Sequence, residues 1–204
     1  MSGEESRKTG TTTVGIRIND GVVLAADTQA SLGNMVSSKD IEKVLKITDR
    51  IGITTAGSVG DAQYLVRIIK AQTKMYKYEE KRNITIKSLA TLLSNILQRN
   101  KVPIPFMNQL ILGGYDEEGA KIGTLDPLGG LIFEEKFTAT GSGSPMAYGL
   151  LEDEYDADMS IEEAKDLGKR TVKAASQRDI YTGEKKVQVV SITEEGYESN
   201  FIEQ

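Results

Sequence analysis

The order of its strand and helix patterns is the feature that most constrains how this chain can fold. Blocks of alternating apolar and polar residues, typical of strands with one buried face, are separated by two pairs of helical stretches. Antiparallel sheets must each bury one face, and the economical arrangement packs sheet on sheet with the helices outside. We therefore expect an α+β fold, a four-layer αββα sandwich of two antiparallel sheets flanked by helix pairs.

Turn and capping signals place the individual elements. The expected strands are 12–19, 22–26, 39–47, 51–57, 109–113, 120–125, 131–137, 187–192 and 197–202. The expected helices begin at the cap Asp61, at the cap Thr85, after Pro145 and at the capping box of Ser160 with Glu163. The apolar stripe of the first helix is expected to be Leu65, Ile68, Ile69 and Met75. With 204 residues and no internal repeat or linker, the chain fits a single domain.

The chain contains no histidine and no cysteine. This excludes serine–histidine and cysteine–histidine catalysis, zinc sites built from these residues, and thiol redox chemistry. Any hydrolytic activity therefore needs an amine or a carboxylate as its base. A threonine at the start of a chain supplies a hydroxyl and, beside it, an α-amino group with a pKa of about 8.

A run of threonines joins a short polar leader to the first expected strand, at Gly10-Thr11-Thr12-Thr13. Threonine is common in strands, so the run alone also fits an ordinary strand. Cleavage after Gly10 would free the amine of Thr11 beside its own hydroxyl. Until then that nitrogen is an amide without basicity, and we expect the site to be inactive while the leader is attached.

The charge balance argues against a nucleic-acid partner, since 25 basic residues face 30 acidic ones and form no long basic cluster. Residues 1–10 lack the apolar core of a secretory signal, and no later stretch is apolar enough to span a bilayer. We therefore expect a cytoplasmic protein that does not enter a membrane. The absence of cysteine fits a reducing compartment.

A turn at Asn19-Asp20-Gly21 folds the second strand back along the first. This pairing brings Asp27 close to Thr11. Lys43 and the glycine-containing loop at 56–61 complete a candidate site. From local sequence alone, Asp27 and Lys43 also fit a surface salt bridge worth ~0 to 1 kcal/mol.

Six motifs, in this order, resemble the proteasome β subunits of archaeal type over nearly the whole chain from Gly10 onward. They are Gly10-Thr11-Thr12-Thr13-Val14-Gly15, Ala26-Asp27, Lys43, Ala56-Gly57-Ser58-Val59-Gly60-Asp61-Ala62, Gly141-Ser142-Gly143-Ser144-Pro145 and Gln177-Arg178-Asp179. The resemblance implies an N-terminal-nucleophile hydrolase fold and a threonine endopeptidase that degrades unfolded polypeptides without a metal or cofactor. It implies stacked seven-membered rings formed with other β subunits and α-type subunits, together with a regulatory ATPase ring.

The resemblance also assigns processing and roles. Residues 1–10 would be a propeptide removed autocatalytically at the bond between Gly10 and Thr11, leaving 11–204 as a single catalytic domain. Thr11 would be the nucleophile, Lys43 would lower the pKa of its amine, and Asp27 would hold Lys43. Gly57 would offer its backbone N–H to the oxyanion. The supporting hydrogen-bond network would comprise Ser142, Asp179 and Thr182, although Ser142 alone fits a simple turn and Asp179 a surface charge.

The implied substrate pocket carries no charge, so we expect cleavage after apolar residues. Its residues are Ala30, Ser31, Ile41, Leu45, Thr55 and Val59. The chain departs from the family pattern at Gln29, where arginine is usual, at Ser31, where threonine is usual, and at Thr182, where serine is usual.

Two other readings remain open. A simpler bacterial ring protease related to proteasomes also begins with threonine and needs no α-type partner. A non-catalytic ring subunit would only build the chamber, and it would have no reason to keep Gly10-Thr11 together with Asp27 and Lys43.

Overall fold

The computed structural model describes residues 10–33 and 35–203. Its strands are β1 (Thr13–Ile18), β2 (Gly21–Asp27), β3 (Ala30–Leu32), β4 (Met35–Ser38), β5 (Val44–Thr48), β6 (Ile51–Gly57), β7 (Asn108–Asp116), β8 (Gly119–Leu125), β9 (Leu131–Glu134), β10 (Phe137–Thr140), β11 (Lys186–Thr193) and β12 (Gly196–Glu203). Its helices are α1 (Val59–Glu80), α2 (Ile86–Arg99), α3 (Ser144–Glu154) and α4 (Ile161–Ser176). In this described part of the chain, no helix is long and apolar enough to cross a membrane.

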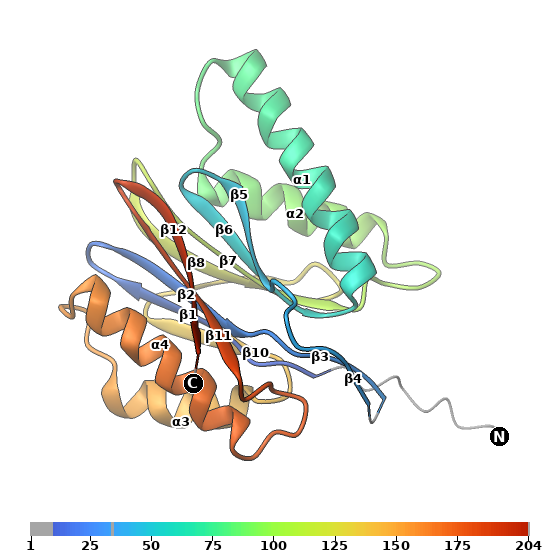
Figure 1. Cartoon of the computed structure of the whole chain (residues 1–204). Coiled ribbons are helices and arrows are strands. Elements are labelled where there is room, and N and C mark those ends of the chain that lie inside the picture. The colour runs from blue at the N-terminus through green and yellow to red at the C-terminus, as the bar shows by residue number, and fades with distance from the viewer. Residues whose placement is uncertain (1–9, 34, 204) are drawn as a thin grey trace.

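Two five-stranded antiparallel sheets form the centre of the molecule, in the orders β10-β1-β2-β11-β12 and β5-β6-β7-β8-β9. Helices α3 and α4 cover the outer face of the first sheet, and α1 and α2 cover the outer face of the second (Figure 1). The four-layer αββα sandwich expected from the sequence is confirmed.

Three apolar clusters hold the layers together, one at each interface between layers. Between α1, α2 and the second sheet lie residues such as Leu65, Ile69, Leu89, Leu93 and Leu110. Between the first sheet and α3 and α4 lie residues such as Val14, Ile16, Leu151, Leu167 and Val189. Between the two sheets lie residues such as Leu24, Val44, Ile111, Ile122 and Val190. Because β2 contributes to two clusters, its seven residues are all buried.

Helix α1 differs from the sequence expectation in its N-terminal cap and in its buried stripe. It is capped by Ser58, whose hydroxyl accepts a hydrogen bond from the Asp61 N–H, so the predicted cap Asp61 was wrong. The Asp61 carboxylate instead accepts from the N–H of Met107. Met75 is 53% exposed rather than part of the buried stripe, because the buried positions follow the spacing Leu65, Ile69 and Thr73.

The strand predicted at 131–137 and the loop predicted around Gly33 both differ from the sequence expectation. The single strand predicted at 131–137 is interrupted at Glu135 and Lys136, where the chain leaves one sheet as β9 and enters the other as β10. The segment expected to be a loop around Gly33 forms the separate hairpin of β3 and β4. This hairpin begins three residues after Asp27, the last residue of β2, and projects from the sandwich (Figure 1).

Candidate active site

Thr11 lies just before β1 and is 3% exposed. Its hydroxyl donates a hydrogen bond to the Asp27 carboxylate at 2.6 Å and is in contact with the Lys43 ammonium. The side chain lines a cavity of about 350 Å³ together with Gly57, Asn108 and Ser142. The structure thus brings the three residues singled out in the sequence into one buried cluster beside an open space.

Asp27 ends β2, and its carboxylate is fully buried. Five hydrogen-bond donors converge on its two oxygens. Oδ1 accepts from Thr11 Oγ1 at 2.6 Å, from the Thr12 N–H at 3.1 Å and from Lys43 Nζ at 2.8 Å, and Oδ2 accepts from the N–H groups of Gln29 at 2.9 Å and Gly183 at 2.8 Å. These donors satisfy a carboxylate that would otherwise be costly to bury.

Lys43 precedes β5, and its side chain is 8% exposed, whereas that of Asp27 is not exposed at all. The two residues therefore do not form the surface salt bridge that local sequence left open. Burial lowers the pKa of Lys43, and the charge and hydrogen bond of Asp27 oppose this effect in part. The ammonium lies beside the Thr11 hydroxyl, where a positive charge favours the loss of the hydroxyl proton.

A second chain of hydrogen bonds starts from the backbone nitrogen of Thr11. This N–H donates to Ser142 Oγ at 3.2 Å, and Ser142 Oγ donates to Asp179 Oδ2 at 2.6 Å. The Thr182 hydroxyl donates to the same carboxylate oxygen at 2.6 Å and is paired with the Thr12 hydroxyl at 2.6 Å. Sequence reasoning missed Thr12, although its place in the threonine run was a signal. Ser142, Asp179 and Thr182 thus lie in one hydrogen-bonded network, and their part in catalysis stays a prediction.

Gly57 ends β6 on the other side of the cavity, with a φ of 138° that favours glycine. A Cβ on Gly57 would collide with the carbonyl oxygen of Met107. The Ser58 N–H donates to that oxygen at 2.8 Å, and Asn108 Nδ2 donates to the Ser58 carbonyl at 3.0 Å. These bonds fix the backbone at the point where Gly57 faces the same cavity as Thr11.

Gly10 is packed tightly at the end of the leader. A Cβ at this position would collide with Tyr181 and would lie 2.5 Å from Ser142 Oγ. Only a residue without a side chain fits this approach. Residues 1–9 of the expected propeptide lie outside the described residues.

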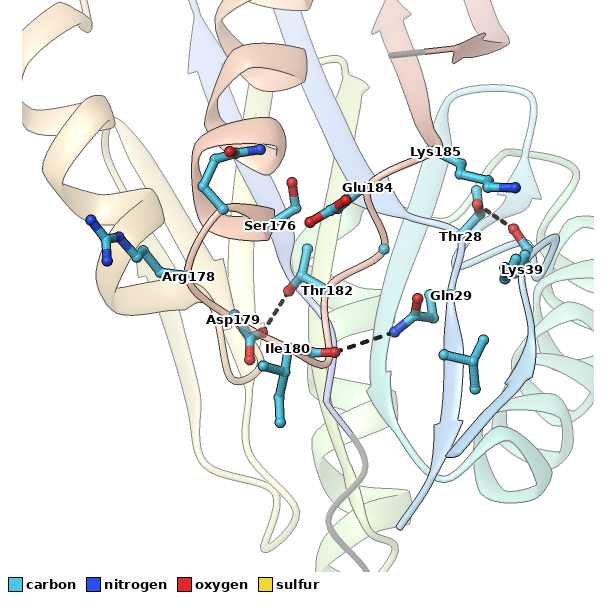
Figure 2. A pocket seen from close by; sticks show the side chains of 13 residues that line it. Thr28, Gln29, Lys39, Ser176, Arg178, Asp179, Ile180, Thr182, Glu184 and Lys185 are labelled. Carbon is cyan, nitrogen blue, oxygen red and sulfur yellow. Dashed lines mark hydrogen bonds between the residues drawn. The ribbon is translucent and has the colours of Figure 1, made fainter. Parts of the chain in front are cut away.

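A second cavity of about 330 Å³ lies beside the Asp179 network (Figure 2). The Gln29 side chain crosses its rim, with Nε2 donating to Ser31 Oγ at 3.2 Å and to the Ile180 carbonyl at 3.5 Å. The side-chain amide of Gln29 therefore links the segment after β2 to the loop around Ile180.

The residues of the predicted substrate pocket lie apart from the lining of the cavity at Thr11. Leu45 packs against the cluster under α1 and α2, Thr55 is buried on β6, and Val59 is 44% exposed at the start of α1. Ala30, Ser31 and Ile41 are partly exposed. None of these six described residues is among those that line the cavity at Thr11. Their role stays a prediction.

An αββα sandwich whose first strand begins beside a buried threonine has the arrangement of the N-terminal-nucleophile hydrolase fold. The model of the family described as proteasome subunit matches residues 7–192, and the chain belongs to this family.

Proteins similar to the chain over nearly its full length are archaeal β subunits. It is 58% identical to proteasome subunit beta 2 of Thermococcus gammatolerans over 199 residues, covering 98% of each chain. It is 56% identical to proteasome subunit beta 1 of Pyrococcus horikoshii over 197 residues, covering 97% of this chain and 98% of that one. It is 53% identical to a proteasome subunit beta of Methanocaldococcus fervens over 188 residues, covering 92% of this chain and 83% of that one. These similarities favour the archaeal proteasome over the bacterial ring protease.

Asp27→Asn tests the central ion pair. The amide keeps the size of the side chain but leaves the buried charge of Lys43 without its partner, so we expect a loss of about 3 to 5 kcal/mol in the free energy of unfolding. Urea denaturation of the full chain measures it. As a control, Glu162→Gln removes the exposed partner of Lys165 and should change stability little. Equal stability of Asp27→Asn and the wild type would contradict this account.

Proposed function

We propose that this chain is a catalytic β subunit of the proteasome core particle, a threonine endopeptidase that hydrolyses peptide bonds of unfolded polypeptides in the cytoplasm. The observation that carries the proposal is the contact of the Thr11 hydroxyl with both Asp27 and Lys43 in a buried cluster. A ring subunit that only built the chamber would have no need for this cluster. The proposed partners are other β subunits, α-type subunits in stacked seven-membered rings, and a regulatory ATPase ring.

The first proposed reaction is the removal of residues 1–10. Thr11 Oγ1 attacks the Gly10 carbonyl carbon, the bond from that carbon to the Thr11 nitrogen breaks, and the nitrogen takes up a proton to become an amine. Water then hydrolyses the ester that joins Gly10 to Thr11 Oγ1. This releases the leader as a carboxylate and regenerates the hydroxyl. The tight packing at Gly10 supports the proposal, because the attacking oxygen and the carbonyl must approach closely.

The second proposed reaction uses the freed amine as the base. It accepts the hydroxyl proton, directly or through a water, while Thr11 Oγ1 adds to the substrate carbonyl. The Gly57 N–H stabilises the oxyanion, and the leaving amine takes the proton. Water then attacks the acyl-threonine ester and frees the enzyme. Lys43 favours the reactive forms of both the hydroxyl and the amine, and Ser142 with Asp179 orients the amine.

Replacement of Thr11 tests both reactions. After co-expression with an α-type partner, the intact mass of the wild-type β chain should show the loss of residues 1–10, and the particle should hydrolyse peptides. Thr11→Ala should retain the leader up to Gly10 and lose hydrolysis, because it has no nucleophile. Thr91→Ala, on the exposed face of α2, is the matched control. A full-length wild-type chain in an assembled, inactive particle would instead indicate a structural subunit.

The alkaline limb of the activity profile tests the role of Lys43. Its charged form is the proposed active form, and burial lowers its pKa from the ordinary value of about 10.4. We therefore expect kcat/KM to fall as the pH rises, starting below the pH at which an exposed lysine loses its proton. The measurement is peptide hydrolysis across the alkaline range, with the melting temperature followed in parallel. Activity that stays constant into the range of an exposed lysine would exclude this role.

The uncharged pocket predicted from the sequence makes apolar residues the proposed cleavage positions, since a charged side chain would be buried without a partner. Matched fluorogenic peptides with leucine, glutamate or arginine before the cleaved bond test this preference. We expect the leucine peptide to have the highest kcat/KM, by about tenfold or more. Faster cleavage after glutamate or arginine would contradict the assignment of these uncharged residues to the substrate pocket.

A further inference from the structure

Gln188 is a polar residue in an otherwise apolar part of β11. It lies between Val187 and Val189, pairs with Ala26 of β2, and has no exposed surface. A buried amide is costly unless its oxygen and its N–H groups are hydrogen-bonded. Its partners therefore indicate why a glutamine occupies this position.

The Gln188 side chain binds the start of β5 in the opposite sheet. Oε1 accepts from the N–H groups of Lys43 at 3.1 Å and Val44 at 2.9 Å. Nε2 donates to the Val44 carbonyl at 2.8 Å and to Glu42 Oε1 at 3.2 Å, and it lies 3.4 Å from Ser199 Oγ. Three of these partners are backbone groups of Lys43 and Val44.

Strand β5 is at the edge of its sheet, where it pairs with β6. The outward N–H groups of an edge strand need partners when they are buried, because an unpaired buried N–H is destabilising. Gln188 supplies these partners as a neighbouring strand would. It thereby fixes the backbone of Lys43 on one side, while the Thr55 N–H binds the Lys43 carbonyl at 2.9 Å on the other.

The same strand also locates the partner of Lys43. Val187, the residue before Gln188, pairs with Asp27 in the register of β11 and β2. Two consecutive residues of β11 therefore position the buried ion pair. Val187 holds Asp27 through strand pairing, and Gln188 holds Lys43 through its side chain. A change at Gln188 would move Lys43 relative to Asp27 and Thr11, although Gln188 itself contacts neither Asp27 nor Thr11.

We propose that Gln188 is a positioning residue for catalysis, which holds the Lys43 backbone so that its ammonium reaches Thr11 and Asp27. This inference rests on the proposed function, because it assigns Gln188 to the reaction at Thr11. Gln188 is neither one of the described residues that line the cavity at Thr11 nor one of the six residues of the predicted substrate pocket, so we expect it to act mainly on kcat.

Gln188→Met in the assembled, processed particle tests the inference. Methionine has a similar length but no hydrogen-bonding amide. With kcat expressed per active site titrated by a covalent inhibitor, we expect kcat to fall about 10- to 100-fold, since a displacement of about 1 Å can have this effect. KM should stay within about twofold of the wild-type value. Hydrogen exchange should accelerate in the peptide that carries Lys43 and Val44.

Tyr155→Phe is the matched control, because it removes another bond from a side chain to the backbone, the one from the Tyr155 hydroxyl to the Arg17 carbonyl at the end of β1 away from Thr11. It should lower the melting temperature and leave kcat unchanged. Wild-type kcat in Gln188→Met, or the same fall in kcat in Tyr155→Phe, would overturn the inference.

Gln188→Asn keeps the amide but withdraws it by about one carbon–carbon bond, or about 1.5 Å. It is the variant to measure if Gln188→Met does not assemble, and it should show the same fall in kcat with KM unchanged. Wild-type kcat in this variant would also overturn the inference. The wild type and Thr11→Ala are measured alongside. Equal activity of these two would reject the proposed function itself, whereas active wild type with active Gln188 variants would reject only the role of Gln188.

Discussion

The rest of the site depends on the buried carboxylate of Asp27. A charge without solvent is tolerated only when it is paired and hydrogen-bonded, and Asp27 meets this condition with five donors. Those donors come from the residues before β1, from the segment after β2, from Lys43 and from the loop at Gly183. One side chain thus ties four separate segments together, and the requirement to satisfy it holds Thr11 beside Lys43.

The hydroxyl of Thr11 already has its proposed catalytic partners, whereas its backbone nitrogen is not yet a base. On the hydroxyl side, Asp27 and Lys43 are already in contact with Thr11 while Gly10 is still attached. On the nitrogen side, the chain of Ser142 and Asp179 ends at an amide, which has no basicity. In the proposed mechanism a single bond cleavage converts that amide into the base. In this proposal the leader keeps the subunit inactive. The hydroxyl, Asp27 and Lys43 that remove the leader are in place first, whereas the amine that substrate cleavage needs forms only when the leader is removed.

Local patterns were enough to predict the layers and the nearness of Asp27 to Thr11, because alternation and a tight turn determine the pairing of β1 with β2. The contact of Lys43 with both could not be derived locally, since it depends on how two sheets pack, and the family resemblance supplied it. Thr12 and Gln188 were missed, although a polar residue inside the apolar strand 187–192 was a visible signal. The split at Glu135 was missed because one strand pattern runs through a change of sheet.

The most direct test of the central claim is the adduct formed with a peptide α′,β′-epoxyketone. Its ketone reacts with a hydroxyl and its epoxide with an amine, so a cyclic adduct requires both groups on one residue. Mass spectrometry of the digested particle locates the modified residue. This account predicts a doubly bonded adduct on Thr11 as the first residue of the processed chain. An unmodified Thr11, or an adduct elsewhere, would contradict it.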